Sequence, residues 1–229
     1  MKYIFITGVN RGIGFFLTKE LLKRGHSIIG TYRKASDNNN LQKLKSAFPK
    51  TLNLTYLDVT AVVKDELTRY LNSLKAIDIL INNAGILDGG NVSFEKLQID
   101  DLLRSIEVNT LGPMKITQLL LPKLSESANP CVFHMTSQMG SIADNQSGGY
   151  YFYRISKASL NMFNKSFSQD YPNISSIVIH PGWVRTDMGG DHAPISPDIA
   201  AINISDLILT ANNLSSGNFY NYKGEILPW

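Results

Sequence analysis

Short apolar runs alternate with segments of helical apolar spacing along most of this chain of 229 residues. The apolar runs predict strands over residues 3–6, 27–32, 52–57, 77–81, 131–135 and 176–179, with a last strand or hairpin over 219–227. The segments between them predict helices over 15–22, 63–74, 100–121, 151–170 and 197 to about 212, and a short helix that follows a polar loop at 35–40 and ends near Phe48. This alternation is typical of βαβ units and a parallel sheet.

Two of the predicted helices contain residues with a more specific expectation. The apolar residues of 151–170 that are expected to point inward are Ile155, Leu160, Phe163 and Phe167. In the long region 100–121, Pro113 and Pro122 are expected to kink or end parts of the helix, because proline lacks the N–H that the helical ladder needs.

The length of the chain suits one α/β domain with a sizeable core and leaves little for a second domain. We therefore expect residues 1–229 to form a single domain. Its predicted architecture is a Rossmann-type doubly wound α/β fold, with a mostly parallel seven-stranded sheet and helices on both faces.

Composition and charge narrow the function classes. The formal charge of +3 is slight and dispersed, so we expect no nucleic-acid partner. A single cysteine, Cys131, excludes an internal disulfide, and no Cys or His cluster has the spacing of a metal site. The first apolar run is soon interrupted by Gly8, Asn10 and Arg11, which is typical of neither a signal peptide nor a membrane span. We expect a cytoplasmic protein with no membrane partner.

The stretch Thr7-Gly8-Val9-Asn10-Arg11-Gly12-Ile13-Gly14 lies between the first strand and the first helix. Its three glycines permit positive φ and a close approach of the backbone to a ligand, and the helix that follows offers free N–H groups. This combination suits a pyrophosphate. Glycines in such a turn can also serve tight packing alone, and the spacing differs from G-x-G-x-x-G.

Unusual clusters follow four of the predicted strands at their carboxyl ends. They are the glycine turn, Asn82-Asn83-Ala84-Gly85, Ser137, and the segment from Pro181 to Met188. In an open parallel sheet, ligands bind at this edge, where the strand order reverses. Core packing gives no reason for four such clusters at one edge, so the joint pattern favours a binding site.

Tyr153 and Lys157 are four residues apart on a predicted helix and project from one face. A nearby ammonium favours the phenolate, so we expect Lys157 to lower the pKa of Tyr153 toward the working range of an acid-base catalyst. An ordinary amphipathic helix with an aromatic residue and a lysine is the alternative for the pair by itself.

The chain resembles the short-chain dehydrogenase/reductase family, in its single-domain branch, over nearly its whole length. The matching residues are Thr7-Gly8-x-x-x-Gly12-x-Gly14, Asn82-Asn83-Ala84-Gly85, Asn109, Ser137, Tyr153-x-x-x-Lys157 and Pro181-Gly182. The loop residues 138–151 and the ending Gly224-Glu225-Ile226-Leu227-Pro228-Trp229 are similar to those of the C-factor and Sniffer-like carbonyl reductases.

The resemblance implies a catalytic set of four residues. Tyr153 would give a proton to a carbonyl oxygen, Ser137 would hydrogen-bond that oxygen, and Lys157 would hold the nicotinamide ribose. Asn109 would anchor a water that connects Lys157 to solvent. The hydride would come from a nicotinamide dinucleotide.

The resemblance also implies a cofactor site, in which Thr186 would contact the carboxamide and Asp58 the adenine. The predicted cofactor-binding residues are Gly8, Asn10, Arg11, Gly12, Ile13, Gly14, Arg33, Asp58, Val59, Asn83, Ala84, Gly85, Tyr153, Lys157, Pro181, Gly182, Val184 and Thr186. No metal is expected.

The residues after the second strand favour NADP(H) over NAD(H). Strand two ends at Thr31-Tyr32-Arg33, where an NAD enzyme would place a carboxylate for the ribose 2′-hydroxyl. Arg33 and Arg11 would instead meet a 2′-phosphate, for which guanidinium groups are well suited. The alternative is that both arginines are solvated surface charges.

Other conspicuous residues have ordinary explanations. His134 and His180 lie within or at the end of strands and are read as core imidazoles. The residues that either line the substrate pocket or fill the core are Met139, Tyr151, Trp183 and Met188.

We therefore expect an NADPH-dependent oxidoreductase that reduces aldehydes or ketones to alcohols, with a small-molecule carbonyl or alcohol substrate. The alternative is a dinucleotide-binding sensor or signalling protein of the same fold, although such a protein has no use for the four-residue catalytic set. The short segment 187–197 predicts a small lid and an open pocket for broad, apolar carbonyls. Relatives commonly pair through the helices that contain Asn109 and Tyr153, so a homodimer or homotetramer is possible.

Overall fold

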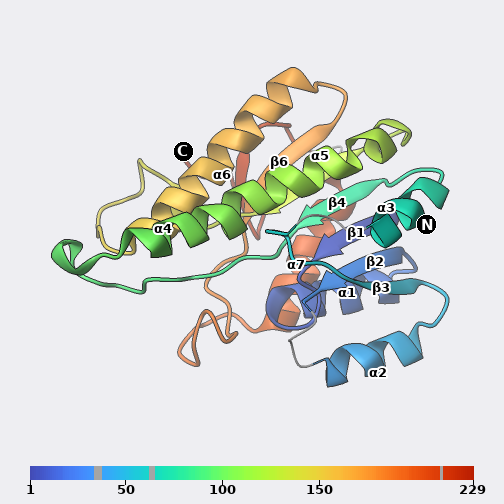
Figure 1. Cartoon of the computed structure of the whole chain (residues 1–229), viewed down its shortest axis with the longest axis horizontal. Helices are drawn as coiled ribbons and strands as arrows, with labels where there is room; N and C mark the ends of the chain where they lie inside the picture. Colours follow the sequence, from blue (N-terminus) through green and yellow to red (C-terminus); the bar gives the residue numbers. More distant parts are fainter. Residues whose placement is uncertain (34–37, 62–64, 212–213) are drawn as a thin grey trace.

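The computed structural model describes residues 1–33, 38–61, 65–211 and 214–229. Its centre is one seven-stranded sheet in the order β3-β2-β1-β4-β5-β6-β7 (Figure 1). All six pairings of neighbouring strands are parallel, so the expected, mostly parallel sheet is parallel throughout its named strands. The order reverses between β1 and β4, as in a doubly wound fold.

The strands form where the chain has short apolar runs. Their bounds are β1 Tyr3–Thr7, β2 Ser27–Tyr32, β3 Leu52–Tyr56, β4 Ile79–Asn82, β5 Cys131–Met135, β6 Ser175–His180 and β7 Phe219–Asn221. Every residue of β2, β4 and β5 is buried, as expected for strands covered on both faces. The predicted seventh segment is a short strand followed by a return, because Ile226 forms an antiparallel bridge with Tyr220.

Helices cover both faces of the sheet and lie between the strands along the chain. Their bounds are α1 Gly12–Lys23, α2 Asn39–Ala47, α3 Asp65–Ser73, α4 Ile99–Ile106, α5 Gly112–Ser125, α6 Tyr151–Asp170 and α7 Pro197–Leu209. Figure 1 shows α4, α5 and α6 in front of the sheet and α1 and α7 behind it. The expected loop at 35–40 and the predicted helix ends at Val63 and Asn212 fall partly or wholly outside the described residues.

Alternation along the strands divides the core into two layers. Ile4 and Ile6 of β1 pack with α1, α2 and α7, whereas Phe5 between them packs with α3, α5 and α6. Successive side chains of a strand point to opposite faces, so a single apolar run supplies both layers. The layers hold the sheet rigid and bring the ends of β1, β4, β5 and β6 to one edge.

The predicted helix 100–121 is interrupted by a different helical geometry. Residues Glu107–Leu111 form a π-helical segment, η2, between α4 and α5. Pro113 lies at the start of α5, so the prediction of a break there is confirmed. The prediction for Pro122 is wrong in that α5 continues past it to Ser125. Its position near the helix end means that few residues depend on the missing hydrogen bond.

One predicted core residue of α6 faces outward. Leu160 and Phe167 are buried and Phe163 packs beside them, but the side chain of Ile155 is 44% exposed. The inward face instead carries polar residues, among them Ser156 and Asn161, which join α6 to the segments that form the active site. The apolar spacing alone could not show that polar contacts fix the rotation of this helix.

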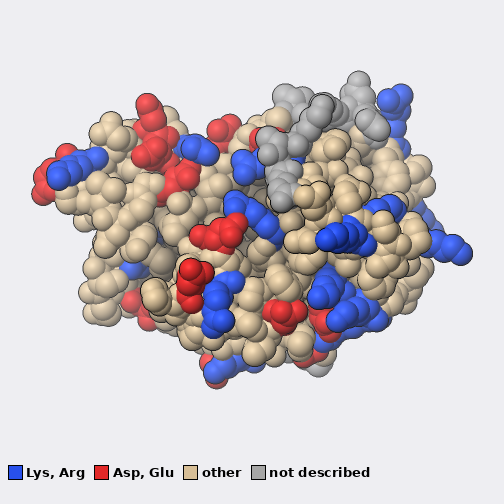
Figure 2. Space-filling model, turned by 90° about the horizontal axis from the view of Figure 1, so that it is seen from below, with Lys and Arg blue, Asp and Glu red and all other residues tan. Residues whose placement is uncertain are grey.

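The surface carries charges of both signs. Figure 2 shows Lys and Arg interspersed with Asp and Glu over the face that it draws. Within the described ranges, each helix is too short or too polar to cross a lipid bilayer.

Candidate active site

A cleft opens at the carboxyl edge of the sheet, next to the point where the strand order reverses. It encloses about 1150 Å³, part of it open to solvent. Its walls come from the glycine turn after β1, the ends of β2 and β3, the loop after β4, and the segments that follow β5 and β6. The four clusters predicted to lie at one edge therefore meet around one cleft, although Ser137 is near the cleft and not part of its wall.

Strict packing requirements fix the glycine turn. Gly8 has a φ of +73°, which a glycine adopts without strain. A Cβ added to Gly14 would lie 2.2 Å from the main-chain oxygen of Gly8, so no larger residue fits there. The turn thus keeps its backbone N–H groups at the first turn of α1 facing the cleft.

The loop after β4 holds the same turn in place. The amide nitrogen of the Asn83 side chain donates to the main-chain oxygens of Thr7, at 2.9 Å, and Gly8, at 3.1 Å. The hydroxyl of Thr7 accepts from the main-chain N–H groups of Asn83 and Ala84, each at 3.0 Å. Asn83 was predicted to bind the cofactor, and its side chain is used to shape the turn. Thr7, the first residue of the matching motif, contributes to the same hydrogen bonds and was not among the predicted cofactor-binding residues.

The turn lies close to the segment after β6 at Gly12. A Cβ added to Gly12, which has a φ of +53°, would lie 3.6 Å from the Thr186 side chain. A side chain at Gly12 would therefore fill the space between the turn and Thr186. The bare backbone on one side and a helix N-terminus behind it fit the pyrophosphate of a dinucleotide.

The far end of the cleft is formed by residues after β2 and β3. Tyr32, Arg33, Asp58 and Val59 line it. Thr60 donates to one Asp58 carboxylate oxygen from its main-chain nitrogen at 3.0 Å and from its hydroxyl at 2.8 Å. The main-chain hydrogen bond is the largest cause that lowers the pKa of Asp58, with a smaller contribution from Arg33. Asp58 is thus an ionised acceptor at this end.

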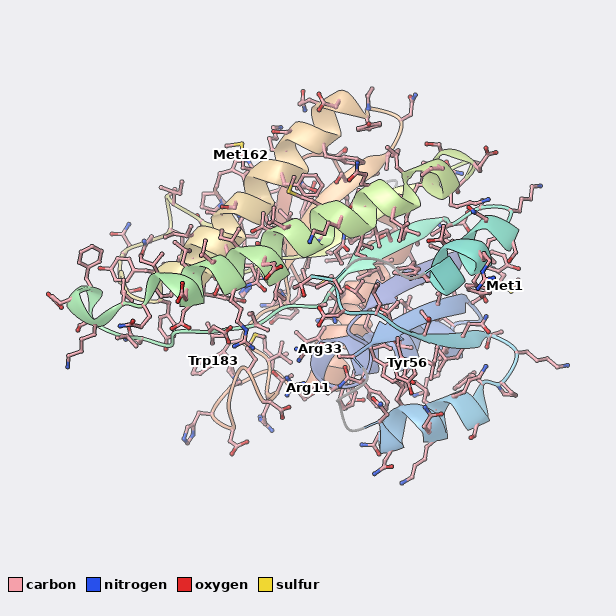
Figure 3. All side chains as sticks on the ribbon, viewed as in Figure 1. Met1, Arg11, Arg33, Tyr56, Met162 and Trp183 are labelled. Carbon is pink, nitrogen blue, oxygen red and sulfur yellow. The ribbon has the colours of Figure 1, made fainter. Side chains whose placement is uncertain are left out.

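Arg11 has a partner that the sequence did not indicate. Its guanidinium lies 2.5 Å from the carboxylate of Asp187, which follows β6, and the two side chains are 64% and 74% exposed. Arg11 and Arg33 both line the cleft (Figure 3). Arg11 therefore links the glycine turn to the segment after β6 across the cleft.

Tyr153 and Lys157 lie at the inner end of the cleft. The Lys157 amine lies 5.6 Å from the centre of the Tyr153 ring and donates to the main-chain oxygen of Met135 at 2.8 Å. Tyr153 shares a hydrogen bond with Ser137, which follows β5. The predicted catalytic tyrosine, lysine and serine are therefore brought together by α6 and β5.

The expected effect of Lys157 on Tyr153 is wrong for the free protein. Burial raises the pKa of Tyr153 to about 12, although the hydrogen bond with Ser137 opposes this change. Burial also lowers the pKa of Lys157 to about 8. Each group is shielded from water, and the loss of hydration favours its neutral form more than the neighbouring group favours its charge.

Asn109 is buried in the π-helical segment, beneath the catalytic pair. Its side-chain nitrogen donates to the Ile86 oxygen at 2.9 Å and to the Ser156 hydroxyl at 3.0 Å, and its side-chain oxygen accepts from the Ile86 N–H at 2.9 Å. The amide thus joins the loop after β4 to α6. Both N–H donors of the amide are used within the protein, and its oxygen accepts one hydrogen bond there.

The cleft wall contains most of the predicted cofactor-binding residues. Gly182 and Val184 are predicted members that do not line it, and Val184 instead forms a bridge with Ile195. The wall residues that were not predicted to bind the cofactor are Tyr32, Leu57, Ile86, Val108, Met135, Thr136, Asp187 and Met188. Most adjoin a predicted residue in sequence, which is the signal that could have identified them.

His134 is fully buried, as expected, whereas His180, at the end of β6, is only partly buried. The Asn82 side-chain nitrogen lies 3.1 Å from Nδ1 of His134, which therefore accepts from it. Burial is the largest cause that lowers the pKa of His134, to about 3, and that of His180, to about 4. Neither residue lines the cleft.

Comparisons with known proteins identify the family of the chain. The profile of the family described as short chain dehydrogenase matches residues 2–194. C-signal of Myxococcus xanthus is 40% identical over 155 residues, which cover 67% of this chain and 93% of that protein. The structure of carbonyl reductase Sniffer of D. melanogaster is 31% identical, covers 100% of both chains and has a TM-score of 0.91. A short-chain dehydrogenase/reductase from Burkholderia multivorans with bound NADP is 31% identical, covers 100% of this chain and 99% of that chain, and has a TM-score of 0.89.

Proposed function

This oxidoreductase belongs to the short-chain dehydrogenase/reductase family, and on that premise we propose that it is an NADPH-dependent reductase of aldehydes and ketones. One observation carries the proposal: the phenol of Tyr153, hydrogen-bonded with Ser137, lies beside the amine of Lys157 at the inner end of the cleft. Residues 1–229 would form one domain in which dinucleotide binding and catalysis share this cleft.

The side chains have complementary roles in this reaction. NADPH, when bound, supplies the hydride. Tyr153 holds a proton on its phenol and donates it to the carbonyl oxygen, which the Ser137 hydroxyl orients by a hydrogen bond. Lys157, beside the phenol, holds the nicotinamide ribose. Thr186 lies across from the glycine turn, where it would contact the carboxamide.

Asn109 would help to supply the proton through its main chain. Its side chain is engaged with Ile86 and Ser156, as described above. Pro113 has no N–H to donate to the main-chain oxygen of Asn109, so the usual helical hydrogen bond to that oxygen is missing. We infer that this oxygen holds the water that connects Lys157 to solvent.

The preference for NADPH rests on the charges at the far end of the cleft. Arg33 lies directly after β2 and lines the cleft, and Arg11 lines it from the glycine turn. A guanidinium is suited to a 2′-phosphate, and no acidic residue follows β2 at the position that would receive a 2′-hydroxyl. The Burkholderia multivorans structure with bound NADP supports the same choice.

A panel of aldehydes, ketones and quinones, assayed with NADPH and with NADH beside the Tyr153→Phe variant, tests the proposal. Turnover that is faster with NADPH and lost in Tyr153→Phe supports it. Intact NADPH binding without turnover on any substrate of the panel rejects the enzyme and favours the second candidate below.

The second candidate is a dinucleotide-binding signalling or sensor protein. It is supported by the relative named C-signal, which is 40% identical to this chain. The presence of Asn109, Ser137, Tyr153 and Lys157 argues against it, because binding alone needs no proton donor. Binding without turnover in the panel would establish it.

We further propose that the enzyme accepts a broad range of apolar carbonyl substrates. The large side chains beside the cleft include Trp183, which is exposed, and Met188, which lines the wall. The segment between Thr186 and α7 is short, so little chain is available to enclose a substrate. Strict selectivity for one polar carbonyl in the panel would contradict this proposal.

Self-association would use α4 and α6, which lie side by side. Their exposed apolar side chains include Ile99, Leu103, Ile155 and Met162. Exposed apolar side chains are common at interfaces, and relatives commonly pair through the helices that contain Asn109 and Tyr153. Sedimentation of wild type and Leu103→Glu would show a dimer or tetramer that the charge converts to a monomer; a monomeric wild type would contradict the proposal.

A further inference from the structure

We propose that Arg154 is a positioning residue that holds the substrate side of the active site in its working shape. Arg154 follows Tyr153 on α6, and its guanidinium reaches over the loop 138–150, which runs from the 3₁₀ turn η3, Gln138–Gly140, to the start of α6. The proposal rests on the proposed function, because it assigns a role in the same reaction.

The guanidinium makes four hydrogen bonds to this loop. Nε donates to the main-chain oxygens of Gly148 and Gly149, each at 3.1 Å. Nη2 donates to the Ser147 hydroxyl at 2.9 Å, and Nη1 reaches the main-chain oxygen of Met139 at 3.4 Å. These acceptors lie at both ends of the loop, so one planar group ties its beginning to its end.

All four acceptors are neutral. Within the described ranges, Arg154 forms no ion pair with a carboxylate. The group is therefore used for the fixed directions of its N–H donors more than for its charge. A lysine would keep the charge and lose this fork of donors.

The loop needs such support because its last residue, Tyr150, has an unfavourable backbone conformation. Gly148, Gly149 and Tyr150 have φ values of +61°, +64° and +47° in succession. Among the described residues, Tyr150 is the only non-glycine residue with a positive φ. It lies directly before the first residue of α6. A side chain in this region costs about 1 kcal/mol or more, so other contacts must hold it.

The other end of the loop is packed against the catalytic lysine. A Cβ added to Gly140 would lie 2.9 Å from main-chain and side-chain atoms of Lys157. The Asn161 side chain donates to the Gly140 oxygen at 3.2 Å. The loop thus follows Ser137, packs against Lys157 and ends at Tyr150, directly before α6.

This path makes the hydrogen bond between Ser137 and Tyr153 depend on the shape of the loop. If the guanidinium is removed, the strained backbone at Tyr150 can relax, and Ser137 and the first turn of α6 can shift relative to each other. A displacement of about 1 Å at reacting groups can cost on the order of 10²-fold in rate. The glycine turn and Arg33 are on other segments and would be unaffected.

The test compares wild type with Arg154→Ala and Arg154→Lys. We expect kcat for a carbonyl substrate of the panel to fall by about ten-fold or more in Arg154→Ala, with the Kd for NADPH within about two-fold of wild type. Added guanidinium should restore part of the kcat of Arg154→Ala and should have no such effect on Arg154→Lys. A purely structural role would not produce this rescue.

Arg24→Ala is the matched control. Arg24 also makes several polar contacts, with Glu20 and Asp206, but these join α1 to α7 away from the cleft. We expect it to keep its kcat and to show no rescue. A kcat for Arg154→Ala within about two-fold of wild type, or the same guanidinium response in Arg24→Ala, would overturn the proposal.

Amide hydrogen exchange separates this inference from the proposed function. Exchange at residues 139–150 should become faster in Arg154→Ala and remain at the wild-type rate in Arg24→Ala, whether or not any carbonyl is reduced. Unchanged exchange in Arg154→Ala would overturn the proposal that Arg154 holds the loop. A wild type without turnover would reject the proposed function, and hydrogen exchange would then be the test of whether Arg154 holds the loop. If Arg154→Ala does not fold, Arg154→Lys is compared with wild type by kcat and by hydrogen exchange.

Discussion

The amine of Lys157 and the ring of Tyr153 lie 5.6 Å apart in a site where both side chains are buried. Burial moves their pKa values apart, to about 8 for the lysine and about 12 for the tyrosine. Below pH 8 the pair is therefore an ammonium beside a neutral phenol. This is the state that the proposed reaction requires, with the ammonium to hold a ribose and the phenol to donate a proton to a carbonyl.

The pH dependence of carbonyl reduction should report Lys157 first. We expect kcat/KM for NADPH to fall as pH rises through about 8, because the free protein loses the lysine proton there while Tyr153 keeps its own. Initial rates from pH 6 to 10 measure this. In Lys157→Arg the descending limb should move to higher pH, since a guanidinium keeps its proton. A wild-type profile that is flat to pH 10 would contradict the assignment.

Arg33→Asp should change the choice of cofactor. We expect KM for NADPH to rise by about 10²-fold, with a much smaller change for NADH, because a carboxylate repels a 2′-phosphate and accepts a hydrogen bond from a 2′-hydroxyl. Initial rates with both cofactors measure the ratio. Lys43→Asp makes the same charge change at an exposed position of α2 and is the control. An unchanged NADPH/NADH ratio in Arg33→Asp would reject the role of Arg33.

Asp187→Asn should improve NADPH binding. Arg11 is paired with Asp187 at 2.5 Å, so the carboxylate competes with a phosphate for the same guanidinium. Exposed pairs contribute up to about 1 kcal/mol, which limits the expected decrease in Kd to about five-fold. Fluorescence titration at low salt measures the decrease, which added salt should reduce. If Arg11→Ala weakens binding but Asp187→Asn leaves it unchanged, the competition does not occur.

His134 should make the protein less stable in acid. Its pKa is about 3 in the folded state against an ordinary 6.5, so the unfolded chain binds the extra proton between these values. The free energy of unfolding should therefore decrease as pH falls below 6.5, by up to about 1.4 kcal/mol per pH unit from this group. Protonation would also place an N–H of His134 against the amide N–H of Asn82, where the neutral ring accepts.

His134→Gln tests this contribution through the slope and not through the absolute stability, which the substitution itself changes. Urea unfolding between pH 4 and 6.5 should give a smaller slope in His134→Gln than in wild type. His192→Gln, at an exposed position, should keep the wild-type slope. Equal slopes for His134→Gln and wild type would show that the buried imidazole does not control acid stability.

The fold could be predicted because its signals are local. Buried parallel strands need continuous apolar runs, and these runs placed all seven strands within a few residues of their positions. The helix at 151–170 has the predicted bounds. The resemblance to the short-chain dehydrogenase/reductase family is confirmed by a profile match over residues 2–194.

The contacts across the site could not be predicted, because they join residues that are far apart in sequence. Arg11 and Asp187 are 176 positions apart, and no motif links them. Ile155 was placed inward by apolar spacing, but polar contacts of Ser156 and Asn161 determine which face of α6 is buried. The pKa of Tyr153 depends on burial, which sequence spacing does not measure.

The π-helical segment Glu107–Leu111 sets the phase between α4 and α5. Each residue of an α-helix turns the chain by about 100°, so one residue more or fewer in this segment would rotate α4 by about that angle against α5. Asn109 and the exposed Leu103 would then move to different sides of the helix pair. Insertions and deletions in this short stretch therefore alter the active site and the outer surface together. Substitutions, in contrast, can change the active site or the outer surface separately.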